Sequence, residues 1–168
     1  SHGRDAATLS LLGMHASAAK LLPAPLDDAW SAAAVIRSLL AIGDSRRAME
    51  VIRDALARWP ESRTELLLVS MGAPCELLLP LARGETVLEA VLLHACDRDR
   101  EASRILAGAG ADLRVTPDVD LLRANLAIRA GDCEEGTRRV NAALGVHGLR
   151  PVSISSERSG IAAVSCGS

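Results

Sequence analysis

The chain has 168 residues, enough for a domain with its own core, and 49% of them are hydrophobic, which excludes an intrinsically disordered protein. Two tryptophans are its only aromatic residues, so the core has to be built from Leu, Ala, Val and Ile. Leucine and alanine are strong helix formers, so the composition predicts an all-helical protein. A formal net charge of -2 and the lack of stacking aromatics argue against a nucleic-acid partner.

Prolines, glycines and capping residues divide the chain into about nine expected helices. In chain order they are expected at 5–22, 28–41, 45–59, 61–70, 75–82, 85–96, 100–109, 117–130 and 133–146. Asp27 is expected to cap the second helix, and Asp44 or Ser45 the third, because a side-chain oxygen there satisfies a free backbone N–H. The sequence thus predicts a helical domain over 1–150 and an extended or disordered tail over the Ser-rich residues 151–168.

Small residues recur where paired helices are expected to cross, at Ala48, Ala102 and Gly136. Ala102 follows Ala48 by 54 residues, and Gly136 follows Ala102 by 34 residues. Gly-Asp joints at 43–44 and 131–132 precede the first and last of them. The pattern resembles the tetratricopeptide repeat, whose period is about 34 residues. The resemblance implies a right-handed solenoid of antiparallel helix pairs, in which the first helix of each pair lines a concave groove.

Aligned residues on the first helix of each pair give the expected groove. Arg37, Val91 and Asn125 occupy equivalent inward positions in the three copies of the pattern. Six residues are expected in or beside the groove: Trp30, Arg37, Val91, His94, Asn125 and Arg129. Arginine and asparagine side chains there suit a carboxylate or a peptide backbone. A solvated concave wall with no ligand is the alternative interpretation.

Two other resemblances are weighed against this one. Residues 92–113 resemble part of an ankyrin repeat, which would also give stacked helix pairs. Residues 138–154 and 160–165 resemble the joint between an N-terminal helical region and a family 2 glycosyltransferase domain of bacterial polysaccharide enzymes. This second resemblance implies the non-catalytic part of such an enzyme, because it covers only the joint and not the glycosyltransferase domain itself.

The residues that often carry chemistry form no recognisable site. Cys75, Cys96, Cys133 and Cys166 lie far apart without a CxxC pair, which favours free thiols and a cytoplasmic location over two disulfides. His94 lies two residues from Cys96, a spacing that points two side chains of a helix in different directions. The sequence predicts no metal, no cofactor and no catalytic residue. It also predicts no membrane span, because no apolar run approaches ~20 residues.

The leading functional prediction is therefore a non-catalytic scaffold that binds a protein or peptide in its groove. The alternatives are the accessory N-terminal region of a polysaccharide glycosyltransferase and, third, a small-molecule or metal-dependent enzyme. Composition and motifs do not predict an oligomeric state.

Overall fold

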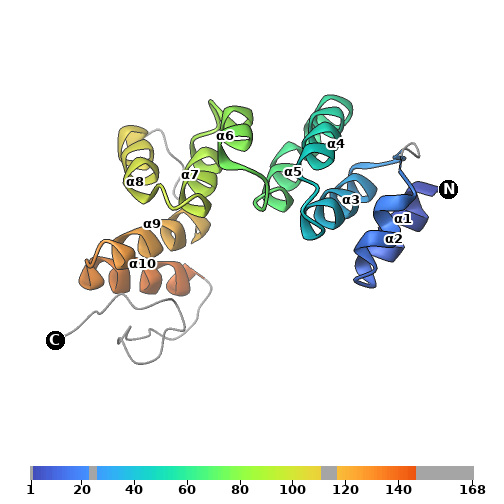
Figure 1. Cartoon of the computed structure of the whole chain (residues 1–168). Coiled ribbons are helices and arrows are strands. Elements are labelled where there is room, and N and C mark those ends of the chain that lie inside the picture. The colour runs from blue at the N-terminus through green and yellow to red at the C-terminus, as the bar shows by residue number, and fades with distance from the viewer. Residues whose placement is uncertain (1, 23–25, 111–116, 147–168) are drawn as a thin grey trace. The chain divides into compact units, whose positions relative to one another are not determined.

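The computed structural model describes residues 2–22, 26–110 and 117–146, and these ranges contain helices and turns but no strand (Figure 1). The all-α prediction is confirmed for this part of the chain. The chain divides into two compact units, residues 1–84 and 85–168. The expected break at 23–25, the loop at 111–116 and the tail at 151–168 lie outside the described residues.

The first unit is arranged around one apolar helix. Its helices are α1 (His2–Leu11), α2 (His15–Lys20), α3 (Ala29–Ala41), α4 (Ser45–Arg58), α5 (Arg63–Val69) and α6 (Cys75–Leu78), with 3₁₀ turns at Pro60–Ser62 and Leu79–Ala82. Helix α3 contacts α1, α2, α4 and α5. Its side chains Val35, Ile36 and Leu39 are completely buried, so α3 forms the centre of this core.

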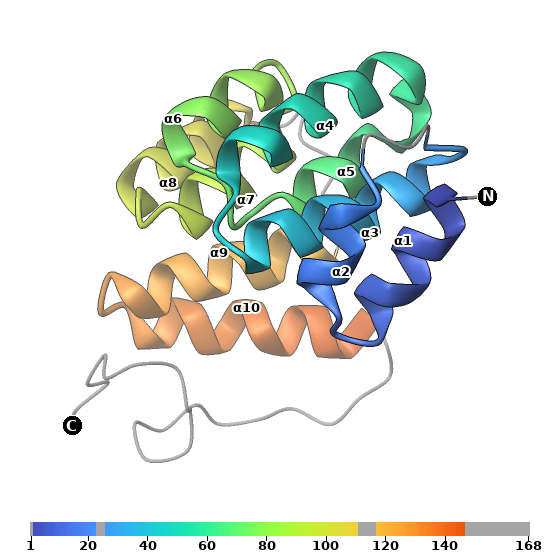
Figure 2. The ribbon, with the colours of Figure 1, turned by 45° about the vertical axis from the view of Figure 1, so that its right-hand side comes forward.

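The described residues of the second unit, 85–110 and 117–146, form two helical hairpins. Its helices are α7 (Thr86–Ala95), α8 (Asp99–Gly108), α9 (Pro117–Arg129) and α10 (Cys133–Val146). Helix α7 packs on α8, α9 lies along α10, and both α7 and α8 contact α9 (Figure 2). Leu92, Leu106 and Ala124 are buried in its core.

The same joint connects the two helices of four hairpins. Its central residue has a positive φ, which is 75° at Gly13, 79° at Gly43, 57° at Asp97 and 87° at Gly131. The N–H of the following residue then donates to the carbonyl five residues earlier, at 2.8 or 2.9 Å in all four cases. This is the Schellman arrangement, which satisfies the last carbonyls of a helix and reverses the chain. Aspartate tolerates this left-handed conformation, so Asp97 serves where the other joints have glycine.

A small residue follows each joint by five positions. These residues are Ala18, Ala48, Ala102 and Gly136, and all four are buried. Each lies in the first turn of the second helix, where its N–H donates to the carbonyl of the residue just after the joint at 2.9–3.1 Å. A tight joint brings the two helix axes together at this level, so only a short side chain fits.

The structure corrects two details of the predicted helices. Residues 5–22 form two helices, α1 and α2, because Gly13 adopts the left-handed conformation and ends the first. Asp28 caps α3, not Asp27, and its carboxylate accepts from the Ser31 N–H at 2.7 Å. Asp44 caps α4 as predicted, accepting from the Arg47 N–H at 3.1 Å. The total is therefore ten α-helices in the described ranges, against the nine expected.

The cysteines also differ from the prediction. Cys75, Cys96 and Cys133 are all disulfide-bonded, and none of the described cysteines is free. The free-thiol expectation is therefore wrong for these three cysteines, and free thiols no longer favour a cytoplasmic location. Disulfides persist mainly in oxidising environments, so these bonds favour a location outside the reducing cytosol. No helix in the described ranges is long and apolar enough to cross a membrane.

Candidate functional site

The first unit has a hollow of about 600 Å³ at its surface, lined by residues of α3, the turn after α4, and α5. We call it the α3–α5 hollow. Helix α3 supplies Trp30, Ala33 and Arg37, which are spaced to lie on one helical stripe. The opposite stripe of α3 carries the buried core residues, so the amphipathic pattern of this helix directs these three side chains outward.

Helix α5 and the turn before it form the other wall of the hollow. They contribute Trp59, Glu61, Ser62, Glu65, Leu66 and Val69. Pro60 begins the short 3₁₀ turn that leads from Trp59 into α5, so the chain reverses directly beside the hollow. Both tryptophans of the chain therefore line the same hollow, although they lie 29 positions apart in the sequence.

The hollow combines aromatic surface with polar groups that have no partner in the described chain. Trp30 is 55% exposed. Arg37, Glu61 and Glu65 form no ion pair or hydrogen bond with any side chain among the described residues, and Arg37 and Glu65 are exposed. Charged groups without internal partners, next to exposed aromatic surface, are available to a ligand.

Three of the predicted groove residues, His94, Asn125 and Arg129, meet in the second unit. His94 Nδ1 lies 2.7 Å from Asp99 Oδ1, and Asn125 Nδ2 lies 3.0 Å from His94 Nε2. Arg129 Nε lies 2.7 Å from Asp99 Oδ2, and its Nη2 donates to Asp97 at 2.8 Å. Asp97 and Asp99 thus bind the side chains of His94 and Arg129 in a network that joins the α7–α8 joint to α9. We call these five residues the α7–α9 network.

One polar atom of the α7–α9 network is unsatisfied. The Asn125 Oδ1 atom is buried and has no hydrogen-bond partner. A carboxylate can only accept, so His94 Nδ1 donates to Asp99, and Nε2 accepts from the Asn125 amide, which gives both ring nitrogens a partner. Arg129 also has its pKa raised by its hydrogen bond to Asp97 and the nearby charge of Asp99. The network is therefore mostly satisfied internally, as expected for a group of residues that fastens two helices together.

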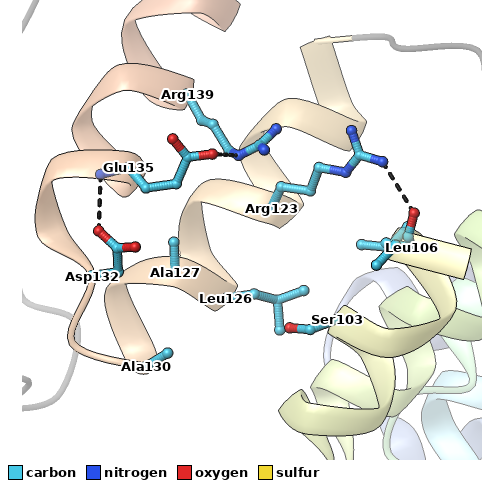
Figure 3. Close-up of a pocket in the computed structure, with 10 residues that line it drawn as sticks. Ser103, Leu106, Arg123, Leu126, Ala127, Ala130, Asp132, Glu135 and Arg139 are labelled. Carbon is cyan, nitrogen blue, oxygen red and sulfur yellow. Dashed lines mark hydrogen bonds and ion pairs between the residues drawn. The ribbon is translucent and has the colours of Figure 1, made fainter. Parts of the chain in front are cut away.

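The second unit has a hollow of about 410 Å³ between α8, α9 and α10 (Figure 3). Its charged residues are also engaged: Arg123 donates to the Leu106 carbonyl at 3.1 Å, and Arg139 lies 2.6 Å from Glu135. Hydrogen bonds from Arg138 and the charge of Arg139 lower the pKa of Glu135 to about 2. The Arg123 bond links α9 to α8, and the Glu135 ion pairs lie within α10, so these contacts leave little charge for a ligand.

The predicted groove residues thus fall into two groups. Trp30 and Arg37 line the α3–α5 hollow of the first unit. His94, Asn125 and Arg129 belong to the α7–α9 network of the second unit, where Val91 is half-buried on α7. No group of three or more His, Cys, Asp or Glu side chains in the described ranges could hold a metal ion.

Sequence reasoning does not find Trp59, Glu61 and Glu65, because the pair Trp59-Pro60 indicates only the end of the helix expected at 45–59. The available signal was the rarity of tryptophan in this chain. No protein-family model matches the chain, and no curated protein or solved structure matches it either. Its function therefore has to be argued from its own geometry.

Proposed function

We propose that this protein is a non-catalytic helical scaffold that binds a protein or peptide segment at the α3–α5 hollow. The observation that carries the proposal is a contrast between the two units. Arg37, Glu61 and Glu65 have no internal partner in the described chain, whereas the charged groups of the α7–α9 network pair with one another. Exposed side chains from two neighbouring helices offer a peptide both apolar surface and polar anchors.

The hairpins support a finer proposal about architecture. Four of them share one joint and one small residue at the helix crossing. This recurrence supports the resemblance to tetratricopeptide repeats, and with it a right-handed solenoid whose first helices, such as α3 and α5, present the binding surface. On this proposal the segment lies across the outer stripes of α3 and α5.

The test is a selection of binding peptides followed by measurement of their affinity. A displayed library of random peptides is selected on the immobilised full chain, and the enriched peptides are titrated against it. Trp30→Ala and Arg37→Ala are expected to weaken binding, while Arg53→Ala, an exposed arginine on α4, serves as the matched control. Peptides that bind all four proteins equally, or no enrichment at all, would count against the hollow as the binding site.

A further inference from the structure

The two tryptophans and the carboxylates around them indicate which kind of side chain the α3–α5 hollow would bind. Resting on the proposed function, we infer that the bound segment places an arginine side chain in the α3–α5 hollow. Trp30 and Trp59 are the chain's only aromatic residues, and both line this hollow. The faces of indole rings attract cations more strongly than those of other aromatic side chains.

The fixed charges of the hollow favour the same ligand. Its lining holds the carboxylates of Asp28, Glu61 and Glu65 and a single guanidinium, that of Arg37. The hydrogen bond from the Ser31 N–H lowers the pKa of Asp28, which further favours the ionised form of that carboxylate. The lining therefore carries an excess of negative charge, which attracts a cation and repels an acidic side chain.

The apolar part of the hollow fits the rest of an arginine side chain. Ala29, Ala33, Leu66 and Val69 line it between the polar groups. Long cationic side chains bury their methylene stems on such surface while the charged head stays with polar partners. A carboxylate of α5, such as Glu65, then suits the guanidinium, which donates two parallel hydrogen bonds to a carboxylate.

The chain already contains one contact between an arginine and a tryptophan ring. The Arg58 guanidinium lies over the Trp59 ring, with its Cζ atom 4.6 Å from the ring centroid. Arg58 also donates to the Leu26 carbonyl at 2.9 Å and pairs with Asp54 at 3.4 Å. Arg58 is not among the residues that line the hollow, but it covers a face of Trp59, so Trp30, which is 55% exposed, is the ring that is open to a bound cation. The planar guanidinium stacks on rings better than an ammonium group, so arginine is favoured over lysine.

The test uses the tryptophans themselves as the probe. The chain has two tryptophans and no tyrosine, and both tryptophans line the hollow, so its intrinsic fluorescence reports directly on this site. The full chain is titrated with acetyl-Gly-Arg-Gly-amide and with the same peptide carrying citrulline, which keeps the shape of arginine but loses its charge. A lysine peptide and a glutamate peptide complete the set.

We expect a saturable fluorescence change with the arginine peptide, a weaker response to lysine, and none to citrulline or glutamate. Replacing Glu61 and Glu65 together by glutamine is expected to lower the affinity for the arginine peptide by about two- to five-fold per carboxylate, the range of exposed ion pairs. Glu76→Gln, an exposed carboxylate on α6, is the control and should leave the affinity unchanged. Added salt is expected to weaken binding, because exposed charges are screened.

Equal responses to the arginine and citrulline peptides would overturn the inference, and so would no response to either. An equal loss in the Glu76→Gln control would show a general charge effect and would also overturn it. A failure of the proposed function, peptide binding at the α3–α5 hollow, would give a different result. If library peptides without arginine bind and change the tryptophan fluorescence, the hollow is a binding site whose occupant is not arginine. If no peptide of any sequence perturbs the tryptophans, both proposals fall.

Discussion

Gly136 of α10 packs directly against Ile128 of α9, and a Cβ atom added to Gly136 would lie 2.5 Å from Cγ1 of Ile128. The same Cβ would lie 3.3 Å from the Ala124 carbonyl oxygen. Ile128 is 7% exposed, so its branched side chain has little room to move away. The smallest residue is therefore required where these two helices cross.

Gly136→Ala is accordingly expected to destabilise the protein. Overpacking of this kind costs about 1–3 kcal/mol, even though alanine is the better helix former. The measurement is the free energy of unfolding from chemical denaturation. Gly145→Ala in the same helix is the matched control, because a Cβ there meets nothing within 4 Å. Gly145 is the residue before last of α10, so this control is expected to change stability by less than about 0.5 kcal/mol, and only Gly136→Ala should destabilise.

Ala48→Leu tests the equivalent crossing in the first unit. Ala48 is fully buried in the first turn of α4, and the extra volume is expected to cost about 1–3 kcal/mol. Ala57→Leu, on the exposed side of the same helix, should change the thermal midpoint very little. If the Ala48 variant melts like the parent protein, the helices of this hairpin do not cross closely at Ala48, and the repeat alignment loses its first copy.

Arg37 and Asn125 are expected to respond differently to truncation, although the sequence pattern treats them as equivalent. Arg37 is exposed and has no internal partner in the described chain, so Arg37→Ala should leave the thermal midpoint unchanged. Asn125→Ala removes the partner of His94 Nε2 and should cost on the order of 1 kcal/mol. Thermal melts of the two variants make the comparison. Equal midpoints would show that the contact with His94 contributes nothing to stability.

Glu135 gives the second unit a specific dependence on acid. Its pKa is lowered from 4.5 to about 2 by the hydrogen bond from Arg138 and by the charge of Arg139. A lowered pKa in the folded state stabilises the protein fully above the unfolded value, and that contribution is lost as pH falls from about 4.5 through about 2. Glu135→Gln should therefore flatten the fall in thermal midpoint over this range. Glu134→Gln, its exposed neighbour, should keep the parent profile.

The disulfides predict a strong effect of reducing agents. Cys75, Cys96 and Cys133 should not react with a thiol reagent in the denatured, unreduced protein, and mass spectrometry after digestion should find them linked. Reduction is expected to lower stability by about 2–4 kcal/mol per lost bond, because a cross-link limits the unfolded chain. Three reactive thiols at these positions in the unreduced protein would contradict the structure and restore the argument for a cytoplasmic location.

The sequence by itself determined the helices and their joints. Most predicted boundaries fall within two or three residues of those observed, from Ala29–Ala41 to Cys133–Val146. The reason is that caps and joints depend on neighbouring backbone groups, as where Asp44 accepts from the Arg47 N–H. Local sequence signals did not predict the division at Gly13, because apolar residues recur with a loose helical period on both sides of this glycine.

Only the tertiary structure decided which side chains meet. Arg129 pairs with Asp97, 32 positions away, and Trp59 shares a hollow with Trp30. Helical periodicity fixes the face on which a residue lies, but not which other helix that face meets. The disulfides were beyond prediction for the same reason, because widely spaced cysteines carry no information about their distance in the fold. What makes the α3–α5 hollow a candidate site is therefore the packing of α3 and α5 together with the turn that places Trp59 beside them.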